Sequence, residues 1–172
     1  MNRIDIRLAT LATALLSAAI LGAALLSQFV GGLQPCVLCV YQRWPYVATI
    51  LLGLAGFALA RRHPGAARIM LALAGLVFFV GGGIAGFHVG VEQGWWQGTS
   101  GCGAPTGGAM TLEDLRAQVL AAPVVRCDEV PWSLLGISMA GYNFIISLVL
   151  AGAALWVAVG LAARRTEDGD EA

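Results

Sequence analysis

The chain has 172 residues, of which 58% are hydrophobic and only 12% charged, and its formal net charge is zero. Soluble domains carry about 25% charged residues, so this composition excludes an ordinary soluble domain and favours a protein that spans lipid. The zero net charge removes the bulk electrostatic basis for binding nucleic acid.

The first two predicted membrane spans cover residues 8–30 and 40–60. The first run carries no charge and is long enough to cross about 30 Å of hydrocarbon, whereas the apolar region of a cleaved signal peptide has only about 7–15 residues. The apolar part of the second span is too short alone, so its helix is expected to begin at or just after Cys39. Arg43 then lies in its first turns, and Pro45 either fits the first turn or kinks the helix.

The last two predicted spans cover residues 69–88 and 134–163. The third carries the spacing Gly82-x-x-x-Gly86, which offers a flat face for another helix. Between the third and fourth spans, Thr111 is a candidate helix N-cap. Apolar residues then follow at helical spacing, which predicts a short amphipathic helix. This helix is expected either to lie on the bilayer surface or to pack on its own loop.

The arginines predict the orientation of the four spans. Seven of the ten flank the spans on one side, at both termini and in the turn 61–68, and the positive-inside rule makes that side cytoplasmic. The loops about 31–39 and 89–133 then lie on the outer side, and the second loop is acidic overall. Four of the five tryptophans lie near span ends on the outer side, as an interfacial aromatic belt requires.

All four cysteines fall in these two outer loops: Cys36 and Cys39 in the first, Cys102 and Cys127 in the second. An oxidising compartment favours two disulfides. Three pairings are possible, and the simplest joins Cys36 to Cys39 and Cys102 to Cys127.

Three interpretations of the cysteines compete. Two disulfides could merely brace loops, but a bond that closes a two-residue loop removes little chain entropy. A four-cysteine zinc site is disfavoured, since the second pair lacks ligand spacing. The third is a redox relay, in which one disulfide exchanges with a soluble partner and the other passes the electrons on.

A relay needs an electron acceptor, and the sequence has no haem, iron–sulfur or nucleotide motif. A lipid-soluble quinone could reach Cys39 from the bilayer. Arg43 follows Cys39 by one helical turn and could bind a quinone oxygen, although an interfacial arginine can also simply extend to the membrane surface. His88 could donate a proton or contact the quinone, or be an ordinary interfacial histidine.

The string Cys36-Val37-Leu38-Cys39-Val40-Tyr41-Gln42-Arg43 at the head of the second span resembles the bacterial disulfide bond formation protein B (DsbB) family. The similarity extends over nearly the whole chain, with four spans, the string from His88 to Glu92 and an outer cysteine pair followed by Trp132. It implies an all-α, multi-pass four-helix bundle with a periplasmic loop that carries the short amphipathic helix.

The resemblance also implies an activity. Members of the family are thiol:quinone oxidoreductases of the bacterial inner membrane, with both termini cytoplasmic. A periplasmic thioredoxin-like oxidase (DsbA) would attack Cys102, Cys127 would attack Cys36, and Cys39 would deliver electrons to ubiquinone or menaquinone beside Arg43. The expectation is a monomer without metal, in contact with membrane lipid, the quinone pool and the DsbA-like partner.

Three alternatives remain. A protein that resembles vitamin K epoxide reductase would place its membrane-proximal Cys-x-x-Cys after the loop cysteines, whereas here it comes first. A non-enzymatic scaffold with structural loop disulfides would tolerate Cys36→Ser. A small transporter would need ionisable residues at mid-span, and these spans carry none away from their ends.

Overall fold

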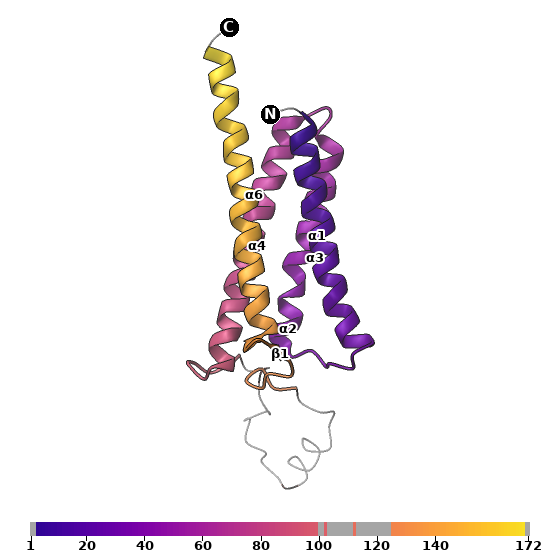
Figure 1. Cartoon of the computed structure of the whole chain (residues 1–172), viewed down its shortest axis with the longest axis vertical. Coiled ribbons are helices and arrows are strands. Elements are labelled where there is room, and N and C mark those ends of the chain that lie inside the picture. Colours follow the sequence, from indigo (N-terminus) through magenta and orange to yellow (C-terminus); the bar gives the residue numbers. More distant parts are fainter. Residues whose placement is uncertain (1–2, 100–101, 103–111, 113–124, 171–172) are drawn as a thin grey trace.

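The protein is described by a computed structural model, which covers residues 3–99, 102, 112 and 125–170. Its helices are α1 (Arg3–Phe29), α2 (Val37–Tyr41), α3 (Arg43–Leu59), α4 (Pro64–Glu92) and α6 (Met139–Asp170) (Figure 1). Within these described residues, four segments are long and apolar enough to cross a membrane: Ile6–Phe29, Val37–Leu59, Pro64–Glu92 and Met139–Gly160. The prediction of an all-α membrane protein with four spanning helices is confirmed.

The helices form an elongated bundle with two distinct ends. Helix α1 packs along α3, α3 along α4, and α4 along α6. Both chain termini lie at one end, while α2 and the strand β1 lie at the other (Figure 1). The end of the bundle away from the termini is called the cysteine end, because Cys36, Cys39, Cys102 and Cys127 lie together there.

Small residues allow the helices to approach closely. A Cβ atom added to Gly53 of α3 would lie 2.8 Å from the carbonyl oxygen of Thr10 on α1. On α4, Gly82 and Gly86 lie against side chains of α6, because an added Cβ would meet Leu148 at 3.1 Å and Phe144 at 3.0 Å. The flat face predicted from the Gly82-x-x-x-Gly86 spacing is therefore the contact surface for α6.

The second span is interrupted between α2 and α3, at Gln42. Pro45 is the third residue of α3 and has no N–H to donate to the carbonyl of Tyr41, and its ring crowds that carbonyl. Gln42 ends α2 and directly precedes α3, with φ −66° and ψ −15°. The proline therefore occupies the first turn of α3, and the helix that it starts is separate from the short helix of the cysteine motif.

Two of the differences between the helix boundaries and the predicted spans concern the cysteine end. Helix α4 runs from Pro64 to Glu92, so His88 lies within its last turns. The last helix begins at Met139 rather than at Leu134, because residues 133–138 form a β-hairpin of β1 (Ser133–Leu134) and β2 (Ile137–Ser138). The two-residue turn of this hairpin has positive φ at Leu135 and at Gly136. The apolar composition of the segment does not indicate such a turn.

The short amphipathic helix expected from Thr111 falls outside the described residues, apart from Leu112. It remains a prediction.

Candidate functional site

Cys36 and Cys39 lie at the start of α2. Cys36 is the N-cap, and its sulfur accepts a hydrogen bond from the backbone N–H of Cys39 at 3.1 Å. Both are free thiols, so the structure holds this pair without the predicted bond between them. Hydrogen bonding from Cys39 lowers the pKa of Cys36 well below its usual range; burial opposes this shift and hydrogen bonding from His88 adds to it. These contacts therefore favour the thiolate form of Cys36.

Cys102 and Cys127 form a disulfide with Cα atoms 5.0 Å apart, across a sequence separation of 25 residues. Both are buried, and they form one apolar cluster with Cys36, Leu38 and Val91. The backbone N–H of Cys127 donates to the carbonyl of Cys102 at 3.1 Å. The second cysteine pair thus packs directly on the first, as an exchange between the two pairs would require.

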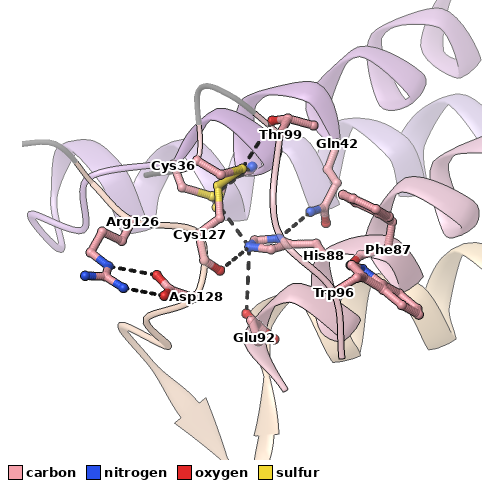
Figure 2. Close-up of a disulfide and its surroundings, with 12 residues drawn as sticks. Cys36, Gln42, Phe87, His88, Glu92, Trp96, Thr99, Arg126, Cys127 and Asp128 are labelled. Carbon is pink, nitrogen blue, oxygen red and sulfur yellow. Dashed lines mark hydrogen bonds and ion pairs between the residues drawn. A yellow bond between two sulfur atoms is a disulfide. The ribbon is translucent and has the colours of Figure 1, made fainter. Parts of the chain in front are cut away.

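His88 of α4 connects the two pairs (Figure 2). Its Nε2 lies 3.6 Å from the sulfur of Cys36 and 3.2 Å from the carbonyl oxygen of Cys127. The carboxylate of Glu92, one turn further along α4, is 4.0 Å from the same nitrogen and accepts a hydrogen bond from Ser138 at 2.5 Å. One imidazole therefore faces a thiol of the first pair and the backbone of the second.

A chain of buried and partly buried hydrogen bonds continues from the other side of His88. Its Nδ1 is 2.8 Å from the amide nitrogen of Gln42, and the Gln42 oxygen accepts from the amide of Asn143 on α6 at 2.5 Å. The hydroxyl of Tyr46 donates to Asn143 and is 3.0 Å from the hydroxyl of Ser147. This chain links α3, α4 and α6 behind the cysteines.

A cavity of about 460 Å³ lies at the cysteine end. Its walls include apolar residues of α1 and α6, and polar groups converge on it from Cys36, Cys39, Arg43, Tyr46, His88 and Asn143. One guanidinium nitrogen of Arg43 donates to the side-chain oxygen of Gln28 on α1 at 2.6 Å. The volume and the mainly apolar lining with few polar groups are those of a small-molecule site.

The same residues could also hold a metal ion. Within the described part of the chain, the ligand atoms of Cys36, Cys39 and His88 all lie within 4.8 Å of one another. Thiolate and imidazole ligands suit zinc, but only while both thiols are reduced, since a disulfide offers no thiolate. The closeness that allows metal binding also suits thiol–disulfide exchange.

The residues predicted from sequence are thus brought together in two groups. Cys36, Cys39, Arg43 and His88 line the cavity, and the Cys102–Cys127 disulfide packs beside it. The sequence indicated no role for Gln42 and Glu92, which contact His88, for Gln28, which contacts Arg43, or for Asn143, which donates a hydrogen bond to Gln42. The available signal was a polar side chain near or within an apolar span, which marks a functional position but does not identify its contacts.

Comparison with known proteins identifies the family of the chain. A family model, Disulfide bond formation protein DsbB, matches residues 6–157. The chain is 35% identical to disulfide bond formation protein B of Methylococcus capsulatus, over 82% of this chain and 87% of that protein. It is 30% identical to the protein of the same name from Xanthomonas oryzae pv. oryzae, over 87% of each chain. No solved structure matches significantly.

A four-helix membrane protein with a helix-start thiol pair packed on a loop disulfide is a membrane disulfide oxidoreductase. The chain belongs to the DsbB family of disulfide bond formation proteins, as the motif from Cys36 to Arg43 predicted.

Proposed function

We propose that the chain oxidises a periplasmic dithiol protein of the DsbA type and passes the electrons to ubiquinone or menaquinone in the membrane. The observation that carries the proposal is the packing of the Cys102–Cys127 disulfide against Cys36, at a cavity that Arg43 also lines. A route for electrons between the loop and the lipid needs these elements in contact.

The cysteine chemistry is a sequence of four thiol–disulfide exchanges. A thiolate of the reduced partner attacks the sulfur of Cys102, which breaks the Cys102–Cys127 bond and releases Cys127 as a thiolate. Cys127 then attacks Cys36 of an oxidised Cys36–Cys39 pair and releases Cys39 as a thiolate. The second thiolate of the partner then attacks its own sulfur in the mixed disulfide, which forms the partner's disulfide and releases Cys102. Cys102 attacks Cys127, which restores the Cys102–Cys127 bond and releases Cys36. The two electrons of the partner then reside on Cys36 and Cys39, and its two protons are released.

The cavity suits a quinone in size and chemistry. An apolar wall fits the ring and tail, while Arg43 offers guanidinium N–H groups to an oxygen that gains negative charge. A bound quinone supplies an acceptor for two electrons and two protons. With a quinone in the cavity, Cys39 would be the donor thiolate and Arg43 would hold a quinone oxygen, while His88 stays beside the Cys36 sulfur.

The proposed setting is the bacterial inner membrane, with the cysteine end periplasmic and both termini cytoplasmic. The arginine distribution supports this orientation, because the positive-inside rule assigns the terminal end to the cytoplasm. Both termini lie at the end of the bundle away from the cysteines, in agreement with it. The chain is proposed to act as a monomer.

The test is quinone reduction by the purified full-length protein, supplied with a reduced DsbA-like partner and with ubiquinone or menaquinone. Wild type should turn over, while Cys36→Ser and Cys102→Ser should be inactive yet inserted and folded. Cys102→Ser should also fail to form the mixed disulfide with the partner. Wild-type protein that holds both disulfides but reduces neither quinone would refute the proposal.

A further inference from the structure

The two ring nitrogens of His88 have different surroundings. Nε2 faces the carbonyl oxygen of Cys127 at 3.2 Å and the sulfur of Cys36 at 3.6 Å. A carbonyl oxygen only accepts hydrogen bonds, so a bare Nε2 would set two lone pairs against each other. This side of the ring therefore requires a proton on Nε2.

The surroundings of Nδ1 require the opposite. In the structure the oxygen of Asn143 accepts from two hydroxyl groups, those of Tyr46 and Ser147, and its amide nitrogen faces Gln42. That nitrogen donates to the Gln42 oxygen at 2.5 Å, which leaves the Gln42 amide nitrogen to donate to Nδ1 at 2.8 Å. A proton on Nδ1 would then oppose an N–H group.

We propose that Gln42 is a positioning residue that keeps His88 neutral, with its single proton on Nε2 and directed at Cys36 and Cys127. In this tautomer His88 is a hydrogen-bond donor to the Cys36 thiolate and not a base. The proton that leaves Cys36 goes to water, because His88 has no free lone pair with which to accept it. The hydrogen bond to the Cys127 carbonyl holds the second pair beside the first.

Two further observations agree with a thiolate at Cys36. Its sulfur also accepts the backbone N–H of Cys39 at 3.1 Å, so two donors converge on it. The pKa of Cys36 is lowered through its contacts with Cys39 and His88, against the effect of burial. Other titratable or charged groups around this cavity are Cys39, Arg43, Tyr46, Glu92, Arg126, Glu129 and Tyr142.

The tautomer can be measured directly in the full-length protein in detergent, reduced at Cys36 and Cys39 and without partner or quinone. The chain has two histidines, so ¹⁵N-histidine labelling with a His63→Asn variant for assignment isolates the ring signals of His88. At neutral pH we expect a protonated Nε2 and an unprotonated Nδ1. A proton on Nδ1 in the wild type would overturn the proposal, whatever the outcome of turnover assays.

Substitution of Gln42 tests whether this residue sets the tautomer. In Gln42→Glu the side chain facing Nδ1 loses its N–H donor, so the Nδ1 signal should move to the protonated position. Gln93→Glu adds the same charge at the exposed end of α4 and should leave the signals of His88 unchanged. An unshifted Nδ1 signal in a folded Gln42→Glu protein would show that Gln42 does not control the tautomer.

A second readout follows the thiolate itself. In a Cys39→Ser background, Cys36 is the single free thiol beside the Cys102–Cys127 disulfide. Gln42→Met removes the donor that keeps Nδ1 unprotonated, so His88 can take a second proton and become a cation beside Cys36. The pH midpoint of Cys36 modification by iodoacetamide should then fall by up to about one pH unit, equivalent to about a tenfold faster reaction below the midpoint. Gln93→Met should match the background rate, and an unchanged pH profile in Gln42→Met would count against the positioning role.

Discussion

Replacement of Arg43 by Met should weaken the use of quinone without impairing the exchange of disulfides. Arg43 is the first residue of α3 and lines the cavity one turn after Cys39. Gln28 takes one of its five N–H donors, which leaves four for a ligand. A hydrogen bond to a charged group contributes about 1.5–3 kcal/mol, so kcat/KM for quinone should fall about ten- to hundredfold.

The assay separates the two half-reactions. Steady-state quinone reduction gives kcat/KM for quinone, and a single-turnover reaction with reduced partner and no quinone gives the rate of exchange at Cys102. Arg43→Lys keeps the charge but loses the planar fork, so its loss should be intermediate. Arg62→Met, at the terminal end of the bundle, is the matched control. If Arg43→Met slowed exchange as much as quinone reduction, or altered neither, the quinone-binding role would be wrong.

Three further predictions concern the thiol and the fold. Because its pKa is lowered, Cys36 should react with iodoacetamide at nearly the same rate from about pH 8 to about pH 6. Over this range the rate for an ordinary thiol falls about tenfold for each pH unit, and a tenfold fall for Cys36 would refute the prediction. Gly53→Val should destabilise the protein by about 1–3 kcal/mol in detergent unfolding, since its side chain would enter the contact with Thr10, whereas Gly22→Val, in open space, should not. Leu135→Asn should stabilise the hairpin by up to about 1 kcal/mol, because asparagine tolerates the left-handed backbone there; an unchanged or lower melting temperature would contradict it.

The sequence by itself determined the class of this protein. Long uncharged runs specify spanning helices, because lipid excludes charge and satisfies no backbone hydrogen bonds. The string from Cys36 to Arg43 is local, so its family resemblance and its place at a helix start could be recognised without a fold. Those features sufficed to predict the four spans and the family.

The break at Gln42 and the hairpin before Met139 were harder to predict. Both depend on backbone geometry: a missing N–H at Pro45 and positive φ at Leu135. Hydropathy is insensitive to such geometry, and a leucine in a left-handed turn is contrary to its usual preference.

Only the tertiary structure decided how the site is built. His88 contacts Cys36, 52 residues away, and Cys127, 39 residues away, and the chain from Gln42 to Asn143 spans 101 residues. A polar side chain near or within an apolar span needs a hydrogen-bond partner, because burial without one costs free energy. The sequence does not identify which residue is that partner. The packing of α3, α4 and α6 selects the partners, and with them the side of the His88 ring that faces the cysteines.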